Sequence, residues 1–506
     1  MANIVKRVDD IPLVSPDEYL LVRFGDPDVG TPFVTSNAEE LLQQVNAISP
    51  SGGGDCPEKS VTGILRAIDA ASFGSRIHVF TDASSKDGML KESVKSAAKA
   101  KEIYINFAVT GSCSPIDPVY EEIARDTGGQ LVVLENVSSA VEDYFDLVEP
   151  GLTGDFEPLM LLSKTLGESS EDAYFPVDST MTSFVINVNM ETKGTILLYR
   201  PAGSAVLESD TDAAISELPN GKVINITSPE PGSWRLNIDG TSGTPYTISA
   251  QGNTPLTFHS FEFVERKGKP GHEGLFPIQG DPLMGIETTA IATIFGSVSN
   301  AEFLLASEEG SIMQYPLLEQ GNAEVDPEDF VGTVTPPAQR FRVYVRGKDM
   351  NGYSFIRTYP PMYQAQPLKV ESLPLQCDYD LLADSTFGAS YRVTYFGEGA
   401  GRFSLEATTN CGSVKSVSQS DVELAQGASS EIEVLLDIPA DTPDETPVYL
   451  TLTATNDADT GQTNSAMVSR LAQAAPPQVP VTVPASGGGG GGCFIQSLLK
   501  GKILSQ

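Results

Sequence analysis

The sequence pattern changes abruptly at Pro150, and this change constrains the fold more than any other feature. Before Pro150, apolar runs of strand length alternate with segments of helical apolar spacing. After it, short alternating runs are separated by Gly, Pro, Asn and Asp. The first pattern predicts a parallel sheet covered by helices, and the second predicts antiparallel β-sandwiches. The sequence therefore predicts a multidomain chain, in which an α/β Rossmann-like domain precedes about three all-β, Ig-like sandwiches.

Segments of the first part fit this interpretation. Glu18–Phe24, Thr31–Ser36 and Arg76–Asp82 are predicted strands, and the last is a continuous apolar run of the kind that buried parallel strands show. Apolar residues recur at helical spacing over Pro57–Ala71. This predicted helix directly follows the glycine-rich run "SGGGD" at Ser51–Asp55.

The glycine-rich run admits more than one role. Asp55 is placed to cap the following helix, with Pro57 in the first helical turn. Phosphate binding is disfavoured, because the run lacks the Gly-Lys-Ser/Thr ending of a P-loop and Asp55 would repel the phosphate. A loop that helps to hold a metal ion is the third alternative.

Turn-rich stretches divide the second part of the chain. We place boundaries at Arg266–Gly274 and near Gln364–Ser372, and a Pro-rich and then Gly-rich segment follows the last predicted sandwich. The predicted units are a partial α/β domain at 1–150, sandwiches at 151–267, 268–367 and 368–474, and a linker and tail at 475–506.

The composition of the chain limits the classes of binding partner and the cellular location that can be expected. The chain has 32 Lys and Arg against 67 Asp and Glu, a formal net charge of −35, so nucleic acid and anionic membranes are unfavourable partners. No run approaches the roughly 20 apolar residues of a membrane span, and the first ten residues show no signal-peptide pattern. A protein ligand or a surface component is the expected partner, with self-association as an alternative.

The five cysteines favour an oxidising compartment. None forms a CxxC pair, which argues against a zinc or thioredoxin-type site. Their positions predict two disulfides within domains, Cys56–Cys113 and Cys377–Cys411, with Cys493 left over. Four free buried thiols is the alternative. The disulfide interpretation places the protein outside the cell or on its surface, although no export signal is visible.

Nothing in the sequence indicates an enzyme. The histidines are His78, His259 and His272, and none has the spacing of a metalloprotease motif or accompanies a GxSxG elbow. His78 lies within a predicted buried strand, so a core role is favoured over catalysis. Trp234 is interpreted as a core residue.

Several motifs together resemble one known family. "GGGDCPE", an apolar helix and then "HVFTDASSKD" look like a von Willebrand factor A domain of the hemicentin-like branch, and the likeness covers about residues 18 to 148. "SPEPGSWRLNIDG" and "RFRVYVRGKDMNGYSFIR" resemble the β-sandwiches that follow this domain in hemicentin-type proteins. The resemblance implies a divalent cation, Mg²⁺, Ca²⁺ or Mn²⁺, held by oxygen ligands. Asp82 matches the Asp of the third metal loop of the family, and Asp55 takes the place of the Thr of the second.

The sequence departs from the family at its beginning. The Asp-x-Ser-x-Ser of the first metal loop does not occur in the first 25 residues, and neither does the apolar strand that should precede it. We expect that the chain is truncated at its N-terminus. The alternatives are a naturally short product without metal binding, or a strand from another chain that fills the gap.

The end of the chain carries a second resemblance. "GGGGGGCFI" resembles the CFI-box of bacterial surface proteins, which would make Cys493 a point of attachment or processing. A tail with an incidental thiol is the alternative. Together, these features predict a secreted or cell-surface adhesion protein with an A-domain head on a β-sandwich stalk. A structural or assembly protein with a non-functional metal site is the second hypothesis.

Overall fold

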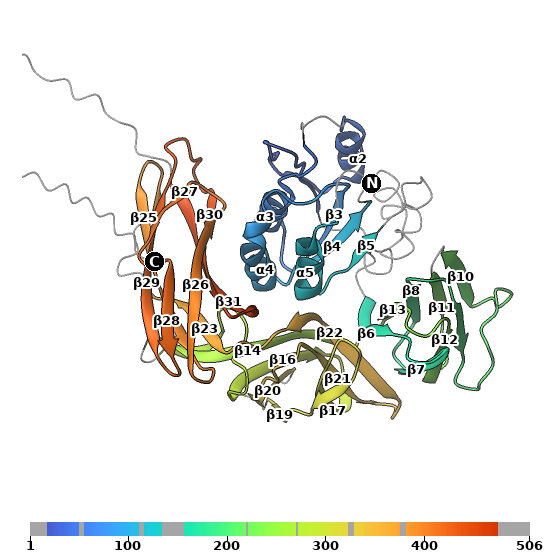
Figure 1. Ribbon diagram of the computed structural model, residues 1–506. Helices are drawn as coiled ribbons and strands as arrows, with labels where there is room; N and C mark the ends of the chain where they lie inside the picture. Colours follow the sequence, from blue (N-terminus) through green and yellow to red (C-terminus); the bar gives the residue numbers. More distant parts are fainter. Residues whose placement is uncertain are drawn as a thin grey trace, which may run out of the picture.

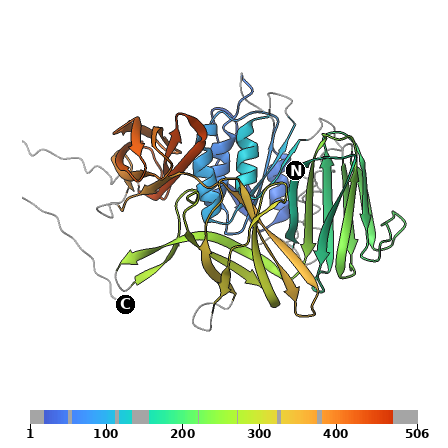
Figure 2. The same ribbon diagram turned by 60° about the horizontal axis from the view of Figure 1, so that its bottom comes forward.

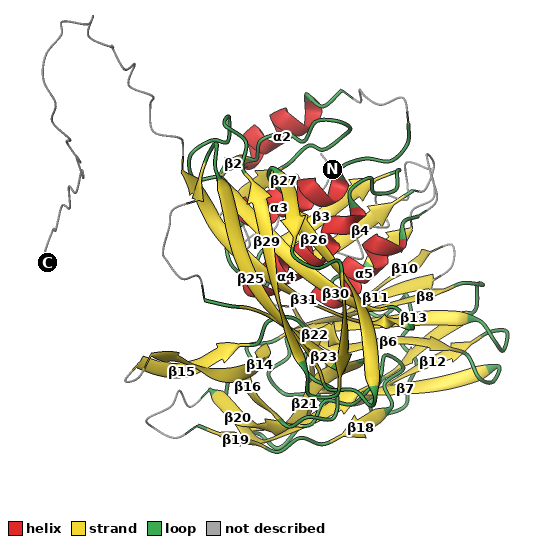
Figure 3. Cartoon of the chain, turned by 60° about the vertical axis from the view of Figure 1, so that its left-hand side comes forward, coloured by secondary structure: helices red, strands yellow, loops and turns green. Residues whose placement is uncertain are grey.

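The protein folds into an α/β domain and three β-sandwiches, as the computed structural model in Figure 1 shows. The structure describes residues 18–49, 55–110, 116–133, 156–218, 221–269, 272–321, 328–374 and 381–473. Among the described residues the helices lie in the first of these domains, and the other three are built of strands and loops, as Figure 3 shows. The predicted fold class, an α/β domain followed by about three all-β sandwiches, is confirmed.

The α/β domain, which we call the head, is built on a parallel sheet of order β3–β4–β5. Its helices pack onto this sheet through an apolar core in which Val61, Phe107 and Tyr120 are fully buried. The strands are β3 (Arg76–Thr81), β4 (Tyr104–Val109) and β5 (Leu131–Val133), and the helices are α3 (Ser60–Ala70), the short η1 (Gly88–Leu90), α4 (Lys91–Ala100) and α5 (Pro118–Thr127).

A smaller unit precedes this sheet. β1 (Tyr19–Leu21) and β2 (Phe33–Thr35) pair antiparallel and pack against α2 (Ala38–Asn46), whose first turn is capped by Asn37. In the described residues β1 and β2 form a sheet of their own, whereas the sequence suggested one continuous sheet. Residues 1–17 lie outside the described ranges, so the predicted loss of the central strand and of the first metal loop is not tested.

The first sandwich consists of a five-stranded sheet, β10–β11–β8–β13–β6, packed against a three-stranded sheet, β7–β12–β9. Trp234 is fully buried between them, with its ring edge-to-face on Phe184 at 4.9 Å, so the predicted core role is confirmed. The strands are β6 (Phe156–Thr165), β7 (Ser170–Val177), β8 (Ser183–Met190), β9 (Thr195–Tyr199), β10 (Ala213–Leu218), β11 (Gly221–Thr227), β12 (Gly232–Asp239) and β13 (Pro245–Asn253).

The second sandwich packs the sheet β15–β14–β16–β20–β19 against β18–β17–β21–β22 around an aromatic core. Its first strand begins at Thr257, so strand pairing separates the two sandwiches between β13 and β14, earlier than the predicted boundary at 267. The strands are β14 (Thr257–Lys269), β15 (His272–Pro277), β16 (Thr288–Phe295), β17 (Val298–Ala306), β18 (Ile312–Gln314), β19 (Leu318–Gln320), β20 (Asp329–Val334), β21 (Phe341–Asp349) and β22 (Ser354–Tyr363).

The third sandwich combines the sheets β23–β25–β29–β27 and β24–β31–β30–β26–β28. Its strands alternate between buried apolar and exposed polar residues, as β28 and β29 show most clearly. The strands are β23 (Leu368–Ser372), β24 (Leu381–Leu382), β25 (Thr386–Tyr395), β26 (Ala400–Thr409), β27 (Ser413–Val417), β28 (Asp421–Ala425), β29 (Ser429–Asp437), β30 (Pro447–Asn456) and β31 (Asp459–Gln473).

The head lies among the three sandwiches and does not extend away from them, as the views in Figures 1 and 2 show. Helix α5 packs against β22 of the second sandwich, and α4 packs against β30 and β31 of the third. Tyr449 of β30 is part of the apolar cluster of the head. At Gly128, which ends α5 with a φ of +79°, an added Cβ would lie 2.6 Å from Pro360, so glycine permits this close approach.

Candidate functional site

The carboxyl ends of β3 and β4 form the candidate site on the head, which we call the carboxyl edge. Ligand sites in open parallel sheets lie at this edge, because the loops that follow the strands meet there. Asp82 follows β3 directly, and Asp55 lies just before α3; both side chains are exposed. The structure therefore places both predicted metal-binding residues at the ends of loops around this edge.

A lysine links the loops of the edge. The Lys86 ammonium contacts a carboxylate oxygen of Asp26 and lies 3.2 Å from Asp55 Oδ2. These contacts raise the pKa of Lys86, so the side chain stays charged. Lys86 thereby joins the loop after β1, the segment before α3 and the loop after β3.

Further side chains fix the same loops. The Asp87 carboxylate accepts hydrogen bonds from the backbone of Val61 at 3.1 Å and of Thr62 at 2.7 Å. Asp117 accepts one from the backbone of Ser85 at 2.9 Å. Asp87 therefore caps α3 from a separate loop, and the predicted cap Asp55 is wrong: α3 begins at Ser60, too far along the chain for Asp55 to reach its first amides.

Glu58 adds a fourth carboxyl group to the edge. Its Oε2 is buried and has no hydrogen-bond partner among the described residues. Burial raises the pKa of Glu58, and the nearby Asp26, Asp55 and Asp82 raise it further. The cluster of four carboxyl groups is only partly offset by Lys86, which gives the edge a negative character.

These residues do not by themselves fit a divalent cation. In the part of the chain that the structure describes, no group of three or more His, Cys, Asp or Glu side chains is arranged to hold a metal ion. Hard cations take six or more oxygen ligands, and Asp55 is already paired with an ammonium group. A cation at Asp55 and Asp82 therefore stays a prediction that the described residues do not support alone.

The cysteines give a mixed result. Cys56, beside the edge, is disulfide-bonded, and the predicted partner Cys113 lies outside the described residues, so that pairing stays a prediction. Cys411 is a free thiol, so the predicted disulfide between Cys377 and Cys411 is absent. The reason is local: Cys411 packs onto the core of the third sandwich, with Sγ 3.8 Å from Thr442 Oγ1. Cys377 and Cys493 are not among the described residues.

The histidines lie apart from the edge loops. Burial lowers the pKa of His78 to about 4, so it is a neutral strand residue, as the sequence indicated. His259 Nε2 lies 3.6 Å from Glu102 Oε2, and His272 is exposed on β15. No two of them share a described contact.

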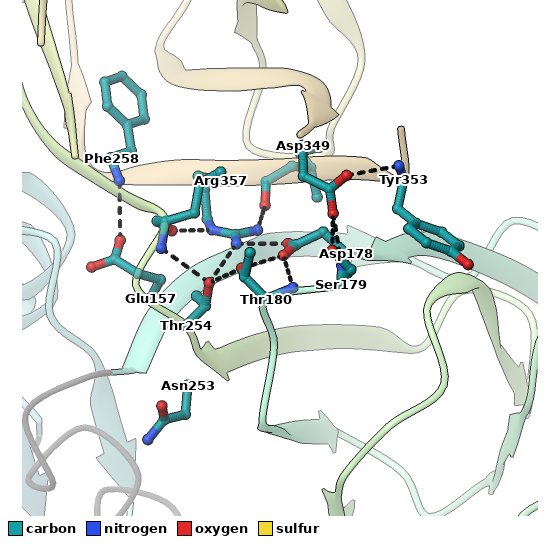
Figure 4. Close-up of polar contacts among 12 residues, drawn as sticks. Glu157, Asp178, Ser179, Thr180, Asn253, Thr254, Phe258, Asp349, Tyr353 and Arg357 are labelled. Atoms are coloured by element: carbon teal, nitrogen blue, oxygen red, sulfur yellow. Dashed lines mark hydrogen bonds and ion pairs between the residues drawn. The ribbon is translucent and has the colours of Figure 1, made fainter. Parts of the chain in front are cut away.

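A second polar cluster joins the first two sandwiches, and Figure 4 shows it in close-up. Arg357 of β22 donates from Nη2 to Asp178 Oδ2 at 2.7 Å and from Nε to the carbonyl of Leu256 at 2.7 Å. The side chains of Arg357 and Asp178 are both fully buried. Asp349 accepts hydrogen bonds from the backbone and the hydroxyl of Ser179, at 2.9 and 2.6 Å. We call this cluster the joint; its groups are satisfied by one another, so it fixes two domains and leaves nothing free to bind a ligand.

Family models match three parts of the chain. Residues 1–136 match the von Willebrand factor A domain, residues 159–255 the hemicentin galactose-binding domain-like module, and residues 380–474 the Ig-like domain of VWA7. The head, with its parallel sheet and loop-rich carboxyl edge, is therefore a von Willebrand factor A domain. The chain as a whole is a multidomain protein in which this domain is followed by Ig-like sandwiches.

Two groups of curated proteins are homologous over most of the chain. Mouse hemicentin-2 is 27% identical over 359 residues, which cover 69% of this chain and 7% of hemicentin-2. The von Willebrand factor A domain-containing protein 7 of rat is 28% identical over 318 residues, 59% of this chain and 34% of that protein, and its mouse counterpart is 25% identical over 403 residues, 73% and 44%. The chain thus spans less than half the length of these relatives. No helix in the described ranges is long and apolar enough to cross a membrane.

Proposed function

We propose that this chain is a non-enzymatic adhesion protein, secreted or held at the cell surface, that binds a protein partner through the carboxyl edge of its head. One observation carries the proposal. The sandwiches contact the head at α4 and α5, and β26 also contacts η1, whereas the described ion pairs of Asp26, Asp55 and Lys86 all lie within the head. The scaffold therefore leaves this edge available.

The order within the edge supports a binding role. Lys86 bridges two loops, and Asp87 and Asp117 fix the loop after β3 from both sides. Binding by ordered loops loses less conformational entropy than binding by loops that must first be ordered. An edge held by several independent contacts is thus suited to recognise one partner surface.

The charge of the edge indicates how a partner would meet it. Asp26, Asp55, Glu58 and Asp82 outweigh Lys86, in a chain of net charge −35. Complementary potentials favour a partner that is basic where it touches the edge. A bound divalent cation, which the family resemblance implies, would reverse this preference, because an acidic side chain of the partner would then complete the coordination. Since the described residues do not form a cation site, we propose the metal-independent mode and treat the metal-dependent mode as its rival.

A structural or assembly role is the second candidate function. The fully buried pair of Arg357 and Asp178 holds two sandwiches at a fixed angle, which suits a rigid spacer. This role predicts self-association without a cation, and it does not require the carboxyl edge to be free.

Binding to immobilised protein separates these proposals. The full chain is tested by biolayer interferometry against purified matrix proteins and against itself, with Mg²⁺ and with EDTA. We expect saturable binding of at least one matrix protein that persists in EDTA and is lost in Lys86→Glu. The matched control is Arg402→Glu, an exposed charge reversal on the third sandwich. Binding that disappears with EDTA would establish the metal-dependent mode, and equal loss in both variants would refute recognition by the edge.

A further inference from the structure

A polar cavity of about 250 Å³ lies between the head and the first two sandwiches. Domain interfaces are preferred places for small-molecule sites, and this volume is below the roughly 300–1,000 Å³ of pockets for drug-sized ligands. The residues of the cavity that matter for binding are Arg76 and Tyr104 from the head, Glu157 from β6 and His259 from β14.

The cavity is separate from the carboxyl edge. Arg76 begins β3, whereas Asp82 follows its last residue, so the two sites lie at opposite ends of the same strand. Six strand residues span roughly 20 Å. A ligand in the cavity would therefore not touch the partner-binding loops, and the two proposals stand or fall independently.

One side of the cavity offers an unpaired cation. The Arg76 guanidinium lies over the Tyr104 ring, with Cζ 5.2 Å from the ring centroid, and it makes no hydrogen bond or ion pair with another described residue. Burial raises the pKa of Tyr104 to about 12, so its hydroxyl remains a neutral donor. A guanidinium group matches the planar geometry of a carboxylate. This side is therefore suited to a carboxylate of a ligand.

The other side offers carboxylate oxygens. Glu157 Oε2 accepts a hydrogen bond from the backbone of Phe258 at 3.3 Å. Burial raises the pKa of Glu157, and the nearby Arg357, Arg76 and His259 offset this only in part, so a ligand ammonium group beside Glu157 would favour its charged form further. Glu102 also lines the cavity, next to His259.

We propose that this cavity binds a small zwitterion of the α-amino acid class, with its carboxylate on Arg76 and its ammonium group on Glu157. A simple anion would pair with Arg76 but meet the charges of Glu157 and Glu102. A simple cation would leave the guanidinium of Arg76 unpaired. Only a ligand with both charges places a carboxylate on Arg76 and an ammonium group on Glu157 at once, and each such charge-assisted contact adds to its affinity. Because the lining comes from three domains, the ligand also stabilises their association.

Calorimetric titration of the full chain tests this proposal. The probes are glycine, L-alanine and L-glutamate, with acetate and methylamine as half-ligands. We expect saturable binding of at least one amino acid, at least about tenfold tighter than either half-ligand. Acetate that binds as tightly as the amino acids would overturn the proposal, and so would the absence of heat with every amino acid at about 10 mM.

Variants locate the binding. Arg76→Gln and Glu157→Gln are each expected to weaken amino acid binding by about tenfold or more, since each removes one charged contact. The control is Arg392→Gln, an exposed residue of the third sandwich whose substitution should leave binding unchanged. Binding that survives both cavity substitutions in folded protein would contradict the assignment. If a variant does not fold, the comparison of amino acids with half-ligands on the unmodified chain still decides.

Discussion

The joint and the carboxyl edge use the same chemistry for different ends. In the joint, Arg357 pairs with Asp178, and both side chains are fully buried between two sandwiches. At the edge, Lys86 pairs with Asp26 and Asp55, and its own side chain is 40% exposed. In each case a basic group ties together segments that are distant in the sequence. The two ion pairs differ in their exposure to solvent. A buried pair stabilises the fold, whereas an exposed pair remains accessible to a binding partner.

The energetic contrast follows from desolvation. A buried pair that loses one member leaves an uncompensated charge in a medium of low dielectric constant, whereas an exposed pair loses little because water replaces the missing partner. The joint should therefore show large effects on stability and no direct effect on binding. The edge should show the reverse.

The largest expected effect is that of Arg357→Ala. The Asp178 carboxylate would remain buried and would keep only its contacts with Thr180. We expect a loss of about 3–5 kcal/mol in the free energy of unfolding of the first two sandwiches. Trp234 is the sole tryptophan and is fully buried in the first sandwich, so its fluorescence reports this transition during urea unfolding.

Two controls sharpen this measurement. Arg392→Ala removes an exposed arginine and should cost less than about 1 kcal/mol. The double variant Arg357→Met, Asp178→Leu removes both charges and should recover much of the loss. A loss in Arg357→Ala no greater than that in Arg392→Ala would show that the joint does not hold the sandwiches together.

The second effect concerns the contact between the head and the third sandwich. Tyr449 donates a hydrogen bond to Asp69, and burial raises the pKa of Asp69 to about 6. A carboxyl pKa above the ordinary value near 3.9 means that the protonated form is favoured in the folded protein. The stabilising contribution of Asp69 is therefore full below pH 4 and is lost as the pH rises through about 6, a change on the order of 2–3 kcal/mol.

Asp69→Asn tests this pH dependence. The variant keeps an acceptor for Tyr449 but cannot ionise, so its stability relative to the unmodified chain should rise between pH 4 and pH 7. Thermal unfolding followed by circular dichroism across this range gives the difference. Asp421→Asn, an exposed site, is the control. A constant difference over the whole range would contradict a raised pKa of Asp69 in the folded protein.

A smaller effect is expected at a neutral contact in the same interface. The hydroxyls of Ser93 and Thr451 lie 2.8 Å apart, and both residues are fully buried. Thr451→Val should cost about 1–3 kcal/mol, because it leaves the Ser93 hydroxyl buried without a partner. Ser93→Ala combined with Thr451→Val should cost less than the single change. Additive losses in this double-mutant cycle would show that the two hydroxyls do not interact.

The sequence predicted the elements more reliably than the contacts between them. The alternation after Pro150 reflects local burial, as β28 and β29 show, and the apolar run of Arg76–Asp82 predicted the strand β3, although only Val79 of that strand is buried. The helix cap of α3 was wrong because Asp87, the true cap, comes from a loop 25 residues further on. Such contacts depend on the tertiary fold, so they cannot be predicted from the local residue pattern.

One residue of the joint could have been predicted from the sequence pattern of β22. Phe355, Arg357 and Tyr359 alternate along β22, which places the arginine on the same face as two buried aromatic residues. A charged residue at an inward position requires a partner. The identity of that partner, Asp178, could not be predicted, because it lies 179 residues away on another domain. At the edge, Lys86 stands within the quoted "FTDASSKD" motif, but its role depends on Asp26, which local spacing does not connect to it.

The smallest effect on stability, and the most informative one for function, is that of Lys86→Met. Lys86 and Asp55 are exposed, although Asp26 is only 16% exposed, so we expect a loss of about 1 kcal/mol, with Trp234 fluorescence unchanged. The substitution removes the ammonium group that joins Asp26 and Asp55 and leaves four carboxyl groups without a counter-charge.

Calorimetric titration of Mg²⁺ and Mn²⁺ into Lys86→Met and into the unmodified chain separates the metal-independent mode of adhesion from the metal-dependent one. Binding that appears only in Lys86→Met would mean that the ammonium group excludes a cation from the edge. Saturable binding to the unmodified chain that is lost in Asp82→Ala would mean instead that the predicted cation site is formed with residues outside the described ranges, and the metal-independent proposal would fail. When Trp234 fluorescence shows that both variants remain folded, a difference in binding can be assigned to the edge itself.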